Sequence, residues 1–403
     1  MGMRYLRRIS TRRLIALCAA TVAVGVGVTA LAMAATGGGP TPPPEPLPVA
    51  VHDALSAPKV EGVSARIKFT NDLITGSDVQ GADPLLTGAS GRLWATSDGQ
   101  LRIELQADSS AEGATSDSQV ISDGHRWFVY DSGSNTAYEG TVPADHGGAD
   151  AANSNNEQPP SLDRIKKGIA RLAEHAIVSG AQPTDIAGQP AYNVRVEPKD
   201  NGGLLGGAEL AWDAVHGTPL RAAVYAKGDS SPVLELKVTD ISYGPVSASV
   251  FDVKPPPDAK VTEVSPPAHR DGGSGEAQPI TGLQAVQQQA SFPISAPDTL
   301  AGLPRSEVRL IRSGTDAGAL VTYGEGLGGV AVIEQPANAS HDSSQASGDH
   351  GQLSLPQVSV NGAQGQQLET ALGTMVRFQR DGIEYTVLAS APSATVLTAA
   401  RAL

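Results

Sequence analysis

The side chains in this sequence that are best suited to ligate a metal ion lie close together in the C-terminal third of the chain. His341–Asp342 and Asp349–His350 offer two imidazoles and two carboxylates, which are usual ligands of zinc. Both pairs fall within residues 337–352, a polar insertion of Ser, Asp, Gln and His with no expected helix or strand to fix their geometry. We therefore expect a solvated loop here and no metal site.

The common catalytic signatures are missing from the sequence. No G-x-S-x-G, G-x-x-x-x-G-K-[ST] or H-E-x-x-H motif occurs, which leaves the hypothesis of an exported hydrolase without a supporting constellation. Gly202–Gly207 has the composition of a phosphate-binding loop, but it lacks the lysine and does not lead into a helix, so a hairpin tip is expected there. The sequence predicts a protein that is not an enzyme and that uses no cofactor.

The first 35 residues are typical of an export signal. Five arginines without an acidic partner precede Leu14–Ala35, an uncharged apolar run that ends in Ala32–Met33–Ala34. A signal peptidase reads small residues at that spacing, whereas the run is also long enough to span a bilayer as a helix. Residues 1–35 are therefore expected to be a signal peptide or an N-terminal membrane anchor. The rest of the chain is expected at the outer face of the cytoplasmic membrane, or secreted after cleavage.

Composition narrows the partners of the exported part. The formal net charge of the chain is −13, even though five of its 29 basic residues lie in the N-terminal segment. So acidic a chain is not expected to bind nucleic acid or to grip anionic lipid headgroups. The single cysteine, Cys18, lies in the apolar run, so the exported part must be stabilised by burial without disulfides. Abundant Gly and Pro with few aromatics favour short strands and turns.

Two stretches rich in Pro and Gly divide the chain. Residues 36–48 contain a run of glycines and prolines that cannot form a helix or a central strand, and they predict an extended spacer. Residues 261–279 combine prolines with flexible glycines and predict a linker. The expected domains are residues 49–260 and 280–403.

Between these stretches, apolar and polar residues alternate as they do in half-buried strands. Asp98–Gly99 and Asp123–Gly124 predict tight hairpins, and the strands therefore form an antiparallel meander. The two expected helices, Val49–Leu55 and Ser161–Ile177, either cover its apolar face as a core or leave part of it open for an acyl chain. The candidate ligand-binding residues on this face are Leu101, Ile103, Leu105, Tyr192, Val194, Leu234 and Leu236.

The C-terminal block predicts a smaller α+β domain with an antiparallel sheet. Helices are expected at Thr281–Ala290 and at Ser393–Leu403, the latter with Ser393 as its N-cap. Asp381–Gly382 predicts a further hairpin turn. The expected strands are Glu307–Arg312, Ala319–Tyr323, Val330–Glu334, Gln357–Val360, Thr374–Arg380 and Glu384–Leu388.

Val120–Asp131, followed by Asn135–Tyr138, resembles a hairpin motif of LolA-like proteins. The further motifs that follow the order of that family are Leu210–Asp213, Gly217–Arg221, Thr239–Tyr243 and Val250–Pro256. Residues 50–260 are thus similar to the LolA/RseB-like superfamily, which includes the outer-membrane lipoprotein carrier and a sensor that regulates an anti-sigma factor. The resemblance implies an α+β fold with an unclosed antiparallel β-barrel or curved sheet, and with helices as a lid over an apolar cavity for acyl chains.

Residues 280–403 resemble a small domain of unknown function that occurs in bacterial exported proteins. The residues that carry this likeness are Pro297–Pro304, Val321–Tyr323, Val332–Gln335, Val360–Gly362 and Val376–Tyr385. The first functional hypothesis is a tethered, non-enzymatic protein that binds an acyl chain, lipid or lipoprotein. The alternative is an extracytoplasmic regulator, because a LolA-like domain followed by a second domain resembles the sensor, whose partner is a membrane anti-sigma factor.

Overall fold

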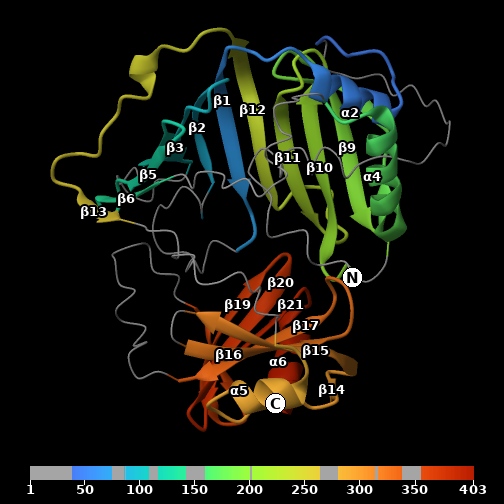
Figure 1. Ribbon diagram of the computed structural model, residues 1–403, viewed down its shortest axis with the longest axis vertical. Coiled ribbons are helices and arrows are strands. Elements are labelled where there is room, and N and C mark those ends of the chain that lie inside the picture. The colour runs from blue at the N-terminus through green and yellow to red at the C-terminus, as the bar shows by residue number, and fades with distance from the viewer. Residues whose placement is uncertain are drawn as a thin grey trace, which may run out of the picture.

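The computed structural model of the protein describes residues 39–74, 86, 88–108, 117–141, 159–199, 202–263, 280–313, 316–337 and 355–403. Two sheets of 13 and 8 strands dominate these residues, with few helices (Figure 1). The export segment, the two His–Asp pairs and most of the 261–279 linker lie outside the described residues. Within the part of the chain that is described, we find no helix with the length and apolarity to cross a bilayer.

The first sheet is curved and unclosed (Figure 1), and its strands are antiparallel except for β13. Its strand order is β13-β6-β5-β4-β3-β2-β1-β12-β11-β10-β9-β7, with β8 also paired to β9, and β13 runs parallel to β6. The strands are β1 (Gly62–Asn71), β2 (Ala89–Thr96), β3 (Leu101–Ala107), β4 (Asp117–Ser122), β5 (Arg126–Asp131), β6 (Thr136–Thr141), β7 (Ala176–Val178), β8 (Gln182–Ile186), β9 (Gln189–Pro198), β10 (Leu205–Asp213), β11 (Pro219–Ala226), β12 (Leu234–Tyr243) and β13 (Lys260–Glu263).

The predicted hairpin turns are confirmed by the backbone. Gly99 joins β2 to β3 with φ 96°, and Gly124 joins β4 to β5 with φ 90°, in the left-handed region that glycine adopts without a steric penalty. The carboxylate of Asp123 accepts hydrogen bonds from the amides of His125 (2.8 Å) and Arg126 (2.6 Å). The turn residues therefore fix the registers of the strands that they join.

Two helices, α2 (Leu47–Ser56) and α4 (Leu162–His175), lie over β9 and β10 at one end of the first sheet (Figure 1). Ile165 and Ile169 of α4 are buried there, as the helical spacing of apolar residues predicted. The hydroxyl of Ser161 accepts a hydrogen bond from the amide of Arg164 at 3.4 Å, so the predicted N-cap is confirmed.

The end of the Pro/Gly-rich spacer is extended, and it packs on the sheet. Pro42 is buried, and the hydroxyl of Tyr192 on β9 donates a hydrogen bond to the Pro43 carbonyl at 2.7 Å. The spacer is therefore held at this point before the chain enters α2 at Leu47.

The second sheet is antiparallel throughout, in the order β14-β15-β16-β17-β21-β20-β19-β18. Its elements are α5 (Leu283–Gln289), β14 (Thr299–Leu300), β15 (Leu303–Ser313), β16 (Asp316–Tyr323), β17 (Val330–Pro336), β18 (Gln357–Val360), β19 (Ala363–Thr370), β20 (Gly373–Arg380), β21 (Ile383–Ala389) and α6 (Ser393–Ala402). The core joins Val286 of α5 and Val396 of α6 to one face of the central strands.

Three features of this part differ from the sequence-based expectation, and the first is the short strand β14, which was not predicted. Strand β19 was not predicted, because its polar sequence AQGQQLET lacks the alternation that marks a half-buried strand. The N-cap of α6 is Pro392, with no side-chain cap, and the predicted Ser393 cap is wrong. The Pro392 carbonyl already accepts from the amides of Thr395 and Val396, and Ser393 is therefore the first residue inside the helix.

Main-chain hydrogen bonds join the two sheets. The amide of Leu204, in the tip between β9 and β10, donates to the carbonyl (3.2 Å) and hydroxyl (2.9 Å) oxygens of Ser390 after β21. The amide of Ala371, between β19 and β20, donates to the carbonyl of Leu73 just beyond β1 (2.9 Å). Gly202–Leu204 thus belong to a hairpin tip, as predicted, while Leu205–Gly207 begin β10, and the tip also contacts the second sheet.

Candidate functional site

The registers place all seven predicted site residues on one face of the first sheet, which we call the apolar face. Side chains of residues paired across antiparallel strands point to the same side. Val194 on β9 pairs with Leu210, Leu210 with Ala222, and Ala222 with Leu236 on β12. Tyr192 and Leu234 lie two residues away on the same strands and share this side.

The same face continues over the other half of the sheet. Leu236 pairs with Phe69 of β1, and Ala65, four residues earlier, pairs with Leu93, which pairs with Ile103. Leu101 and Leu105 flank Ile103 at a spacing of two. One row therefore crosses seven strands with apolar or aromatic side chains: Ile241, Ala65, Leu93, Ile103, Val120, Val129 and Tyr138.

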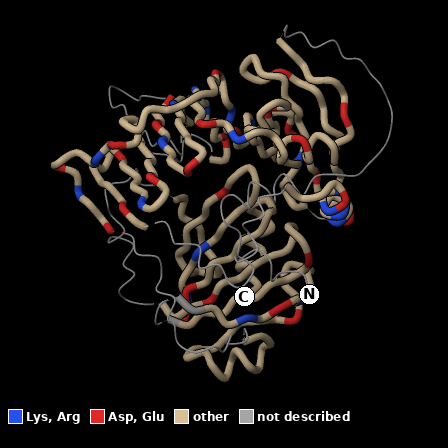
Figure 2. Tube along the Cα trace, turned by 45° about the horizontal axis from the view of Figure 1, so that its top comes forward, with Lys and Arg blue, Asp and Glu red and all other residues tan. Residues whose placement is uncertain are grey.

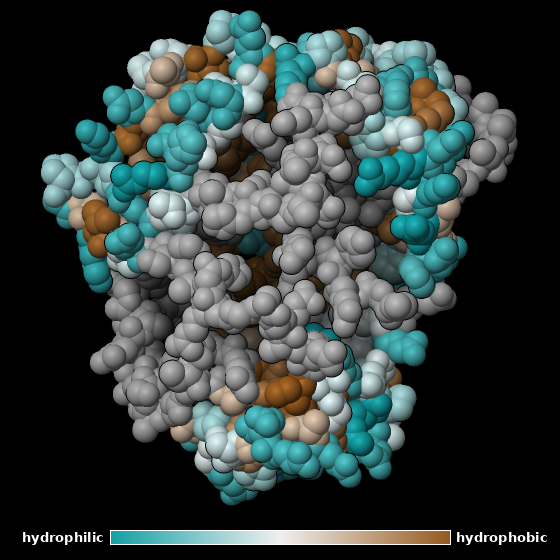
Figure 3. All heavy atoms as spheres, viewed as in Figure 1, coloured by the Kyte–Doolittle hydropathy of each residue, from teal (hydrophilic) through white to brown (hydrophobic). Residues whose placement is uncertain are grey.

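The helices cover the apolar face unevenly. Tyr192 and Val194, beneath α2 and α4, are 3% and 1% exposed, whereas Leu236 is 43% exposed. Leu101, Ile103, Leu105 and Leu234 are half-buried. The two alternatives that the sequence left open, a packed core and an open surface, therefore occupy different parts of the same face. In Figure 3 hydrophobic residues are visible in the hollow of the molecule, within a largely hydrophilic periphery.

The alternation pattern of the sequence did not identify every residue of the apolar face. Trp127 and Val129 lie on it because Trp127 pairs with Ser122, the partner of Leu101, and Val129 pairs with Val120, the partner of Ile103. Their signal was ambiguous, since Trp127–Tyr130 is apolar or aromatic at every position and alternation could not assign sides. Gly140 is opposite Trp127, and a Cβ there would lie 2.6 Å from the indole ring, so glycine is required beneath it.

The opposite face of the sheet is polar. Glu209 accepts hydrogen bonds from Arg195 (3.1 Å), Arg221 and the Tyr225 hydroxyl (3.0 Å), and Arg221 also pairs with Glu235. Burial acts to raise the pKa of Glu209, but these donors outweigh it and lower the pKa. Figure 2 shows Lys and Arg interspersed with Asp and Glu over the upper part of the molecule. An apolar ligand would have to displace these ion pairs, so this face does not suit one.

Asp213 and His216 have the groups of a catalytic dyad. The fully buried carboxylate of Asp213 accepts from the amides of Val215 (2.7 Å) and His216 (2.9 Å) and from the Tyr243 hydroxyl (2.6 Å). Burial acts to raise its pKa, and these donors lower it. The His216 ring stacks on Tyr243 at 3.9 Å. The acceptor capacity of Asp213 is used to fasten the β10–β11 turn to β12, which is a structural role.

The described residues do not bring metal-ligating side chains together. No group of three or more His, Cys, Asp and Glu that could hold an ion occurs among them. The two His–Asp pairs noted in the sequence fall in residues whose structure is not described.

Comparison with known proteins gave likenesses among solved structures. No protein-family model and no curated protein matches the chain. The structure of MucB in complex with MucA(peri) shares 15% sequence identity with this chain, covers 87% of this chain and 94% of its own, and has a TM-score of 0.39. The structure of MucB alone shares 16% identity, covers 87% of this chain and 95% of its own, and has a TM-score of 0.35. A putative outer membrane lipoprotein-sorting protein domain from Vibrio parahaemolyticus shares 10% sequence identity, covers 51% of this chain and 95% of its own, and has a TM-score of 0.20.

These identities and TM-scores are low, so the ligands and partners named for these structures are properties of those proteins and are not transferred to this chain. The fold is α+β. Its first sheet is the unclosed, curled antiparallel sheet with helices on one face that the resemblance implies.

Proposed function

We propose that the protein is an extracytoplasmic, non-enzymatic binding protein that takes up an acyl chain of a lipid or lipoprotein on the apolar face. The observation that carries this proposal is the uneven cover of that face: Leu236 is 43% exposed on the same side of the sheet as the fully covered Val194. Residues 49–260 would form the binding domain on the first sheet, and residues 280–403 a second domain on the second sheet.

The chemistry of the two faces favours a hydrocarbon ligand. Each methylene group removed from water contributes about 0.8 kcal/mol, so a chain of about ten methylenes could outweigh the entropic cost of binding. The apolar face has a row of seven apolar or aromatic residues, and Arg and Glu are paired on the opposite face. An acidic chain has little charge to hold an anionic headgroup, so the acyl chain itself is the part recognised.

The N-terminal segment supports a location outside the cytoplasm. Its basic residues followed by a long apolar run are those of an export signal or anchor. If the run remains uncleaved, the protein works within reach of the membrane. The mass of the mature chain distinguishes a tethered protein from a secreted one.

Copurified lipid is the direct test. We expect native mass spectrometry of the full chain to detect bound lipid, and dansyl-undecanoic acid to bind with enhanced fluorescence. Leu236→Glu should weaken the binding of this probe about tenfold or more, because a carboxylate would lie in the acyl path. The matched control is Ile177→Glu, at a residue that is 55% exposed on β7.

Circular dichroism should show that both variants are folded. A wild-type protein with no copurified lipid and no affinity for the probe would refute the proposal. An equal loss of probe binding in the two variants would show that the apolar face is not the binding site.

A second candidate function is an extracytoplasmic regulator that contacts a membrane protein such as an anti-sigma factor. The hydrogen bonds from Leu204 to Ser390 and from Ala371 to Leu73 favour it, since they connect the proposed lipid-binding sheet to a second sheet that could contact a partner. Hydrogen exchange in β20 and β21 should then change when the acyl probe binds. Unchanged hydrogen exchange in β20 and β21 would refute the regulator and leave the function of a binding protein without a regulatory role.

A further inference from the structure

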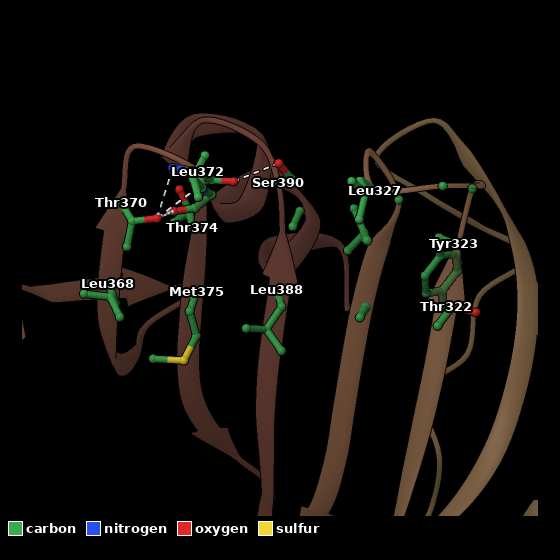
Figure 4. Close-up of a pocket in the computed structure, with 17 residues that line it drawn as sticks. Thr322, Tyr323, Leu327, Leu368, Thr370, Leu372, Thr374, Met375, Leu388 and Ser390 are labelled. Atoms are coloured by element: carbon green, nitrogen blue, oxygen red, sulfur yellow. Dashed lines mark hydrogen bonds between the residues drawn. The ribbon is translucent and has the colours of Figure 1, made fainter. Parts of the chain in front are cut away.

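The second sheet has a groove on the side opposite α5 and α6. Leu368, Met375, Leu388, Ala331 and Thr322 pair in turn across β19, β20, β21, β17 and β16, and they form one row. The core row, which contains Val376, Val387, Val332 and Val321, is offset by one residue on each strand and therefore faces the helices. Figure 4 shows Leu368, Met375 and Leu388 side by side from neighbouring strands.

The groove is apolar and open to solvent. It encloses about 560 Å³, and none of the described residues that line it is charged. Leu327, in the loop between β16 and β17, is 57% exposed at its rim. A cavity of this size is within the range that holds small ligands.

The polar groups in and around the groove are largely used within the protein. Thr370 accepts from the amides of Leu372 and Gly373, Thr374 donates to the Ala391 carbonyl, and Ser390 donates to the Leu372 carbonyl. Beneath the groove, β16, β17, β21 and β20 are central in the sheet, and their main chains are paired on both sides. An extended peptide would therefore bury N–H and C=O groups without partners, at a cost that a hydrocarbon chain does not incur.

The groove lies beside the contacts between the two sheets. Leu372 and Ser390 line it, and Ser390 accepts from Leu204 of the first sheet. Ala371, next to Leu372, donates to the carbonyl of Leu73. Leu73 follows the end of β1, where Asn71 pairs with Leu234 of the apolar face. The groove therefore lies next to the end of the first sheet at which Asn71 of β1 pairs with Leu234 of β12.

We propose that this groove is a second acyl-chain subsite, and that the ligand is a two-chain membrane lipid held by both sheets at once. One chain lies on the apolar face and the other in the groove, with the headgroup toward solvent. The proposal rests on the proposed function for the class of ligand, and it adds the number of chains and a second place of binding. The contacts at Leu204 and Ala371 then hold the two subsites at a fixed separation.

A photoreactive lipid tests this assignment. The full chain would be irradiated with a phosphatidylcholine that carries a diazirine in each acyl chain, and the labelled peptides would be identified by mass spectrometry. We expect label both in β3 or β12 and in β19–β21. Met375→Glu and Leu327→Glu should remove the label in β19–β21, retain it in the first sheet, and weaken lipid binding about tenfold or more.

Leu327→Glu keeps the test valid if Met375→Glu fails to fold, because the Leu327 side chain is exposed. Val261→Glu, at an exposed residue of β13, is the matched control and should leave both sets of labels unchanged. Label confined to the first sheet would overturn the second subsite and leave the proposed function standing. Label confined to the groove would overturn the proposed site on the first sheet, and the absence of label would overturn both.

A remaining outcome is association between copies of the chain. If sedimentation shows a wild-type dimer that Leu327→Glu converts to a monomer, the groove is a protein interface and the acyl subsite is refuted.

Discussion

The first sheet has α2 and α4 over the end formed by β9 and β10, whereas the second sheet has α5 and α6 packed on residues of its central strands. Each helix pair builds a core against its sheet. In the first sheet, the same face extends beyond the helices to exposed Leu236, while in the second sheet the uncovered groove lies on the other face. Apolar strand residues of the first sheet are therefore buried where α2 and α4 pack on them, and Leu236 of the same face remains exposed.

Buried carboxylates show a further difference between the two regions. Asp213 of the first sheet accepts hydrogen bonds from two amides and a tyrosine hydroxyl. Glu334 of the second sheet is equally buried but accepts one, from the amide of Ser295 at 2.8 Å, and its other oxygen has no partner among the described residues. Burial raises the pKa of Glu334 to about 7. At neutral pH, ionisation of Glu334 therefore destabilises the second sheet, whereas the charge of Asp213 in the first sheet is stabilised by its hydrogen-bond donors.

The largest expected effect tests the helix-covered part of the apolar face. Ile169→Ala removes a fully buried side chain of α4 and should lower the free energy of unfolding by about 2–5 kcal/mol. Urea denaturation followed by tryptophan fluorescence measures it, because Trp94, Trp127 and Trp212 all belong to the first sheet. Ile177→Ala, at an exposed residue, should cost less than about 1 kcal/mol. Equal losses would mean that the helices do not form the core described.

A slightly smaller effect is expected from Glu334→Gln. The unfolded carboxyl, with its ordinary pKa of 4.5, loses its proton before the folded one, with a pKa of about 7. The stability of the second sheet should therefore fall as pH rises from about 4.5 to 7, by about 3 kcal/mol in total. Glu334→Gln should remove most of this fall, so that the variant matches the wild type at pH 4 and is more stable at pH 8.

Calorimetric unfolding across pH 4–8 measures this difference. Glu369→Gln, at an exposed residue of β19, is the control and should preserve the wild-type slope. Parallel curves for the wild type and Glu334→Gln would show that the buried carboxyl is not the source of the pH dependence.

The smallest expected effect concerns the contact between the two sheets. Gly203 has φ 62°, and a Cβ there would lie 2.3 Å from the Ser390 carbonyl oxygen, whereas Gly188 has φ 75° with open space around it. Alanine at either position adds backbone strain of about 1 kcal/mol, but only Gly203→Ala should displace the hairpin tip from Ser390. Hydrogen exchange at the amide of Leu204 should then be faster. Equal acceleration in Gly188→Ala would show that strain, and not the contact, is responsible.

The sequence by itself determined the four helices, the hairpin turns and the strands with marked alternation, because these signals are local. Alternation at Leu101–Leu105, the turn at Asp98–Gly99 and the helical spacing of Ile165 and Ile169 each act over a few residues and survived in the structure. Strand β19 could not be predicted from its own sequence, because pairing with β18 and β20 stabilises it and its residues show no apolar alternation.

Only the tertiary structure decided which parts of the apolar face are covered. The alternation marks Val194 and Leu236 in the same way, yet one lies beneath α4 and the other is exposed, because burial depends on where distant helices pack. The groove beside Met375 likewise needs five strands to come together. Local sequence sets the side to which a residue points, and long-range packing sets what it meets there.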